Sequence, residues 1–128
     1  MIGGKVADPS ALAAYVRGDS IALQAWLAVA RDRGIVLHIP GMALAEARAV
    51  HPEAGTLLSA LLDHPWVVHT ELSRTEAPRI VQLLTDSRAW DGTAGHVVLV
   101  ARERGWPVLS ADPDRLRRIA PDLDVDLL

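Results

Sequence analysis

The stretch PVLSADPDRL, residues 107–116, joins a short apolar segment directly to two acids. Residues 107–109 have the composition of a buried strand, and residues 113–119 are expected to form a short helix. Asp112 stands between the two elements, where its carboxylate can cap the helix or hold a metal ion. The placement of other acids along the chain bears on which of these roles it has.

Short apolar segments alternate with helical patterns along the whole chain. We expect strands at residues 5–7, 35–39, 66–69, 107–109 and 125–128, the first of them weakened by Gly3 and Gly4. Ser73-Arg74-Thr75-Glu76 has the spacing of a capping box, and residues 91–104 form a helix apolar enough to lie in the interior. This alternation predicts an α/β protein with a mainly parallel sheet covered by helices on both faces.

Length and composition limit the class of protein. The 128 residues fit one domain, residues 1–128, without a repeat or linker that would divide them. The absence of cysteine excludes disulfides and thiolate metal sites, and a net charge of −3 argues against non-specific adhesion to nucleic acid. The opening MIGGK is not a signal peptide, and no apolar run is long enough to span a membrane. We therefore expect a cytoplasmic protein.

Asp8 and Asp112 occupy the same topological position in two different units. Each follows a strand directly and precedes a proline, so each can be the N-cap of the next helix. In a parallel sheet, ligands gather outside the carboxyl ends of the strands, where both aspartates are expected. Capping and metal binding are compatible, because one carboxylate oxygen can accept a backbone N–H while the other faces a cation.

Glu46 lies on a helical face that is otherwise apolar. Its neighbours three and four residues away are Met42, Ala43, Ala49 and Val50, and Arg48 points elsewhere. Unpaired acids are rarely buried, because removing one from water costs several kcal/mol. Either another part of the fold compensates Glu46, or the side chain reaches solvent at an edge.

Asp91 begins the apolar helix in WDGTAGH, where Gly92 and Gly95 leave room for a close neighbour. It can be a simple N-cap, or it can join the other three acids in one cleft. Clustered carboxylates repel one another, and a hard divalent cation would remove that repulsion. Ligation by oxygen alone selects Mg²⁺ or Mn²⁺.

Four segments together resemble a PIN domain, and most closely the small VapC-type ribonuclease toxins of type II toxin–antitoxin pairs. They are VADPSAL (6–12), PGMALAEA (40–47), WDGTAGHVVLVA (90–101) and VLSADPDRL (108–116). The resemblance covers essentially the whole chain. It implies a three-layer α/β/α sandwich with a central, mainly parallel sheet, and Mg²⁺- or Mn²⁺-dependent cleavage of RNA.

The resemblance also implies a site and partners. Asp8, Glu46, Asp91 and Asp112 would form the acidic metal site, with Asp114 as an auxiliary ligand and Ser10 as a supporting hydroxyl. Beside Asp112, three arginines either meet RNA phosphates or form a solvated helix face: Arg115, Arg117 and Arg118. The implied partners are an RNA substrate, an antitoxin protein and a second copy of the chain in a homodimer.

A different class of function is also compatible with the same residues. The acids could be structural helix caps in a non-catalytic α/β binding module, a degenerate PIN-like protein that acts through a protein partner. The two hypotheses differ in whether removing an acid costs catalysis or only stability.

Overall fold

The structure is a computed structural model that describes residues 3–128. The first two residues of the opening segment MIGGK, on which the expectation about a signal peptide partly rests, lie outside this range. The described chain forms one five-stranded parallel sheet in the order β3-β2-β1-β4-β5. Its strands are β1 (Gly4–Ala7), β2 (Val36–Pro40), β3 (Val67–Thr70), β4 (Val108–Ser110) and β5 (Val125–Leu127). Each lies within one residue of its predicted ends, and the predicted α/β class is confirmed.

Seven α-helices and one short 3₁₀ helix connect the strands. They are α1 (Pro9–Arg17), α2 (Ile21–Arg33), α3 (Gly41–Val50), η1 (Pro52–Ala54), α4 (Gly55–Leu62), α5 (Glu76–Ser87), α6 (Gly92–Arg104) and α7 (Pro113–Arg117). η1 leads directly into α4, and α7 ends two residues earlier than predicted. No described helix is long and apolar enough to cross a membrane.

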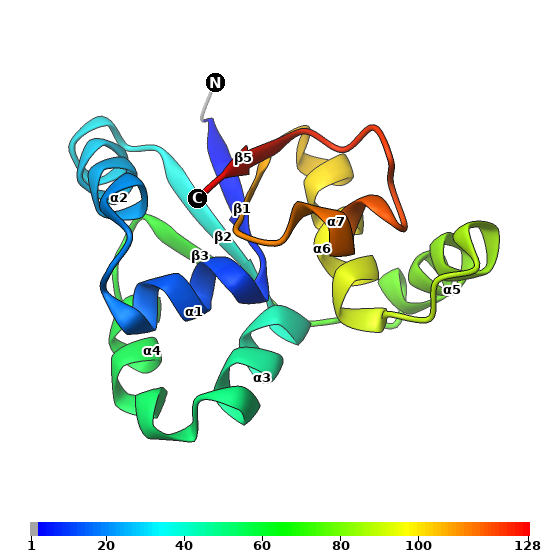
Figure 1. Ribbon diagram of the computed structural model, residues 1–128, viewed down its shortest axis with the longest axis horizontal. Coiled ribbons are helices and arrows are strands. Elements are labelled where there is room, and N and C mark those ends of the chain that lie inside the picture. Colours follow the sequence, from blue (N-terminus) through cyan, green and yellow to red (C-terminus); the bar gives the residue numbers. More distant parts are fainter. Residues whose placement is uncertain (1–2) are drawn as a thin grey trace.

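The strand order places helices on both faces of the sheet. The chain moves from β1 outward to β2 and β3, and then returns to the other side of β1 for β4 and β5. Right-handed crossovers in opposite directions put their helices on opposite faces. Figure 1 shows the two groups apart, with α2 at the upper left, α1, α3 and α4 below it, and α5 to α7 at the right. This is the expected three-layer α/β/α arrangement.

Helix α6 is the most deeply buried helix, as its composition predicted. Every residue from Ala94 to Ala101 is buried, and α6 contacts β1 and β2 on one side and α5 on the other. A Cβ atom at Gly95 would lie 3.0 Å from Ile80 Cγ2 of α5, which is tighter than side chains normally pack. Gly95 therefore serves the contact between two helices and does not line an open site.

Candidate functional site

The site lies where the order of the sheet reverses. β1 pairs with β2 on one side and with β4 on the other. The connection after β1 runs toward β2, whereas the connection after β4 runs in the opposite direction, toward β5. Val6 is paired with Val108 and Ala7 with Leu109, which brings Asp8 and Ser110 side by side at the carboxyl ends. In open α/β sheets this reversal point is the usual place for a ligand.

Asp8 is almost fully buried, with 1% of its surface exposed, and three donors surround its carboxylate. Oδ1 accepts hydrogen bonds from Ser10 Oγ at 2.7 Å and from the Ala11 backbone N–H at 2.8 Å. Oδ2 accepts a hydrogen bond from Ser110 Oγ at 2.6 Å. Burial raises the pKa of Asp8, and the hydrogen bonds from Ser110, Ser10 and Ala11 oppose this effect. Asp8 is thus the N-cap of α1 and also an acid that is costly to ionise.

Glu46 and Asp91 converge because α3 packs directly against the start of α6. The Met42 backbone N–H donates to Nδ1 of the buried His96 at 3.4 Å, and α3 and α6 are in contact. Gly92 allows this approach, because a Cβ atom there would lie 3.2 Å from Met42 Cε. The packing turns Glu46 toward Asp91 at the first residues of α6.

Arg115 of α7 lies between these two acids and pairs with both. Its Nη1 and Nη2 donate to Glu46 Oε2 and Oε1 at 2.6 and 2.7 Å. Its Nε and Nη2 donate to Asp91 Oδ2 and Oδ1 at 2.7 and 3.0 Å. The hydrogen bonds from Arg115 are the main reason that the pKa values of Glu46 and Asp91 are both lowered. The compensation that Glu46 required therefore comes from a residue far away in the sequence.

Asp112 and Asp114 lie at the edge of this site and are exposed. The Asp112 backbone N–H donates to Ser110 Oγ at 2.9 Å, so Ser110 joins Asp112 to Asp8. The Asp112 side chain makes no capping hydrogen bond, whereas Asp8 and Asp91 each accept one from the backbone N–H three residues later in the chain. The cap explanation fits Asp8 and Asp91 but is wrong for Asp112.

The predicted residues therefore gather in two adjoining groups. Glu46 and Asp91 meet around Arg115, while Asp8 and the Asp112 backbone meet around Ser110 and Ser10. Within residues 3–128, no three acids or histidines are close enough together to hold a metal ion as they stand. The donor chemistry nevertheless suits a hard cation, because the ligands are all carboxylates and two of them already enclose a positive charge.

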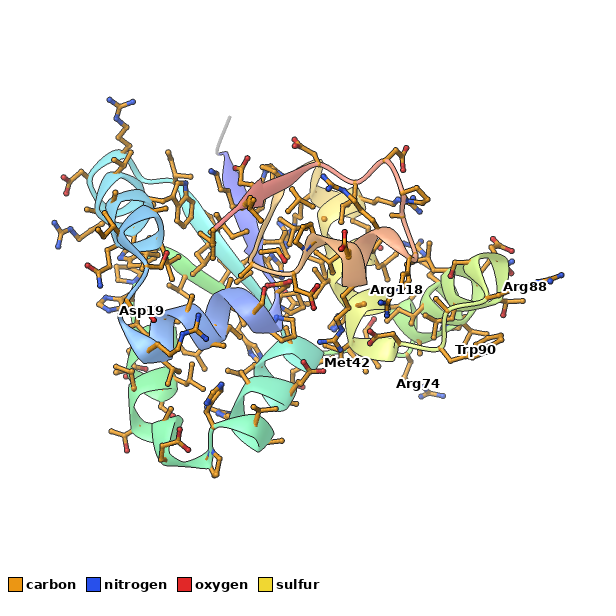
Figure 2. The ribbon with its side chains drawn as sticks, viewed as in Figure 1. Asp19, Met42, Arg74, Arg88, Trp90 and Arg118 are labelled. Atoms are coloured by element: carbon orange, nitrogen blue, oxygen red, sulfur yellow. The ribbon has the colours of Figure 1, made fainter. Side chains whose placement is uncertain are left out.

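Two hollows flank Arg115, and Arg118 lines the larger of them. One hollow of about 450 Å³ is lined by Trp90, Asp91, Arg115 and Arg118 among others, and a second of about 180 Å³ by Ser10, Glu46 and Arg115. Figure 2 shows Trp90 and Arg118 near this region, and Asp19 at the far end of α1. Trp90 is 76% exposed, and Arg117 is exposed as well.

Sequence reasoning missed the role of Arg115 as the partner of Glu46 and Asp91. We predicted it only as a contact for RNA phosphates or as part of a solvated helix face, together with Arg117 and Arg118. The available signal was Glu46 itself, an acid on an apolar face without a local cation. That signal required a distant partner but did not indicate which of the 12 arginines it was.

Comparisons with known proteins agree with this architecture. No family model matches the sequence, and no curated protein matches it significantly. Among solved structures, Mycobacterium tuberculosis VapC20, described as a sarcin–ricin loop cleaving toxin, superimposes with a TM-score of 0.63 at 13% identity, over 83% of this chain and 86% of that one. PAE2754 from Pyrobaculum aerophilum gives 0.62 at 17% identity, over 98% and 92%. The all-parallel sheet flanked by helices and these structural matches show that the chain has the fold of a VapC-type PIN domain.

Proposed function

We propose that this protein is a metal-dependent endoribonuclease, the toxin of a type II toxin–antitoxin pair. The observation that carries the proposal is the convergence of Glu46 and Asp91 beside the reversal point that holds Asp8. These acids come from three distant segments, and simple helix capping does not require Glu46 to be there at all. The fold shared with VapC20, whose description is that of an RNA-cleaving toxin, supports the same conclusion.

In this proposal Asp8, Glu46, Asp91 and Asp112 would hold a Mg²⁺ or Mn²⁺ ion, with Asp114 as an auxiliary ligand. When bound there, the ion would lower the pKa of a water molecule and neutralise the charge that grows on the phosphate. Ser10 and Ser110 orient the Asp8 carboxylate by donating to its two oxygens. In-line attack of water on phosphorus breaks the bond to the 3′ oxygen and leaves a 5′-phosphate and a 3′-hydroxyl.

The proposed RNA-binding surface is the side of the site that carries Arg117, Arg118 and the exposed Trp90. Guanidinium groups suit the phosphate backbone, and an exposed indole offers a face on which a splayed base can stack. The proposed protein partners are an antitoxin and a second copy of the chain, acting in the cytoplasm. The identity of the RNA target would follow from the shape of this surface.

The proposal is tested by incubating the purified chain with two RNA oligonucleotides in Mn²⁺ or in EDTA. One RNA has a mixed single-stranded sequence, and the other carries the sarcin–ricin loop. We expect metal-dependent cleavage of at least one of them, with products that bear a 5′-phosphate. Asp91→Asn should reduce the rate at least about 100-fold, because several kcal/mol of transition-state stabilisation depend on the ion.

Asp19→Asn is the matched control, since it makes the same chemical change at an exposed position away from the site. It should cleave like the wild type. If the folded wild type cleaves neither RNA in Mg²⁺ or Mn²⁺, the nuclease proposal is wrong. The non-catalytic binding module would then be favoured, particularly if Asp91→Asn loses only stability.

A further inference from the structure

Arg115 uses its guanidinium almost completely on the two acids. Nε, Nη1 and Nη2 all donate, and both oxygens of Glu46 and both oxygens of Asp91 accept. The side chain is 26% exposed, between the two hollows described above. Planar two-point pairing of this kind is the strongest arrangement that an arginine makes with carboxylates.

The guanidinium fills the space between the two carboxylates, where a metal ion shared by Glu46 and Asp91 would have to lie. Glu46 and Asp91 carry two negative charges, of which Arg115 balances one. A divalent ion would balance both, but it could bind between the two acids only after the guanidinium moved and some of its four hydrogen bonds were broken. Arg115 and the ion are therefore alternatives for one position.

The position of Arg115 on α7 gives the released side chain a second use. Pro113–Arg117 is a short helix directly after Asp112, and its neighbour Arg118 lines the larger hollow beside Asp91 and Trp90. A guanidinium that left the acids would remain next to that hollow, where a phosphate could accept its two parallel N–H groups.

We propose that Arg115 is the internal counter-cation of the metal site, which the divalent ion displaces from Glu46 and Asp91 and thereby makes available to an RNA phosphate. This inference rests on the proposed function and adds an order of binding to it. The ion binds first, and its binding frees Arg115 to contact RNA. Arg115 is a positioning residue toward the ion and a contact toward the substrate.

Titration of the protein with Mn²⁺ alone, followed by calorimetry, tests the first half. Arg115→Gln removes the competing cation and should bind Mn²⁺ about fivefold more tightly or better, within the usual range of coupling between two ligands. Arg33→Gln is the matched control, because it removes the same charge from an exposed position at the end of α2, outside the site. It should bind Mn²⁺ like the wild type.

Arg115→Lys keeps the protein testable if Arg115→Gln does not fold. Lysine retains one positive charge but not the planar fork, so its Mn²⁺ affinity should lie between those of the wild type and Arg115→Gln. In cleavage assays, Arg115→Gln should need less Mn²⁺ for half-maximal rate and show a higher KM for RNA. If Arg115 had only a structural role, its substitution would not both lower the Mn²⁺ requirement and raise the KM for RNA.

The two possible failures can be told apart. If wild type, Arg115→Gln and Arg115→Lys bind Mn²⁺ equally, or if the wild type binds most tightly, Arg115 is not a competitor and the inference is overturned. If none of the folded variants binds Mn²⁺, the metal site of the proposed function fails as well.

Discussion

At the scale of single residues, Asp8 shows what the burial of a carboxylate costs the fold. It is 1% exposed, and its three hydrogen-bond donors are two hydroxyls and one backbone N–H, none of them charged. Neutral donors offset the loss of water only partly, so the pKa of Asp8 remains raised by burial. A positive ion beside Asp8 would stabilise its ionised form.

Asp8→Asn should therefore stabilise the metal-free protein. The raised pKa means that the ionised carboxylate is harder to form in the folded than in the unfolded chain, so at neutral pH its charge lowers the free energy of unfolding. We expect the midpoint of urea unfolding in EDTA to be higher for Asp8→Asn than for the wild type. Addition of millimolar Mg²⁺ should stabilise the wild type but not Asp8→Asn.

Asp19→Asn again serves as the control, because its exposed carboxylate contributes little in either state. A large loss of stability in Asp8→Asn would show that the buried charge is a structural requirement. In that case the cap of α1 would explain Asp8 without a metal.

At the scale of elements, the first strand illustrates why its two glycines are not equivalent. The sequence predicted a weak strand because Gly3 and Gly4 precede it. The structure gives Gly4 a specific role, since a Cβ atom there would lie 2.6 Å from the Val36 carbonyl oxygen and 2.7 Å from the Trp106 ring. β1 and β2 can pair in this register only because Gly4 has no side chain.

Gly4→Ala should therefore destabilise the protein by roughly 1–3 kcal/mol, the usual cost of forcing extra volume into a packed region. Gly3→Ala is the matched control, because nothing lies within 4 Å of a Cβ atom at that position. Thermal unfolding of the two variants and the wild type measures the difference. Equal melting temperatures for Gly3→Ala and Gly4→Ala would contradict the proposed clash.

At the scale of the whole molecule, stability should depend on pH through the buried histidines. His38 and His96 are 1% and 0% exposed, and neither ring nitrogen of His38 has a hydrogen-bond partner in the described chain. Burial is the main cause that lowers the pKa of His38 to about 4, with Arg104 and His96 adding to the effect. His38 is thus neutral in the folded protein across the physiological range.

We expect the free energy of unfolding to fall as the pH decreases from about 6.5 to about 4. In that interval the unfolded chain binds a proton at His38 while the folded chain does not, so acid favours unfolding, by roughly 3 kcal/mol for this residue. His38→Leu should make the pH dependence measured by urea unfolding shallower, whereas His64→Gln, at an exposed position, should not. Identical pH profiles for His38→Leu and the wild type would contradict this assignment.

The elements of this protein were predictable because the signals for them are local. The capping box is one example, with the Ser73 N–H donating to Glu76 Oε1 at 3.1 Å and the Glu76 N–H to Ser73 Oγ at 3.0 Å. The alternation of apolar strands with helices likewise determined the parallel sheet. That order in turn placed Asp8 and Ser110 together at the carboxyl ends of adjacent strands.

Only the tertiary structure decided which cation Glu46 receives. Arg115 is 69 residues from Glu46 and 24 from Asp91, and it reaches both because α3 and α7 each pack against α6. Helical periodicity and capping depend on neighbours within a few residues, so they could indicate that Glu46 needed a partner. They could not select it, because the pairing depends on how three helices meet across a sheet.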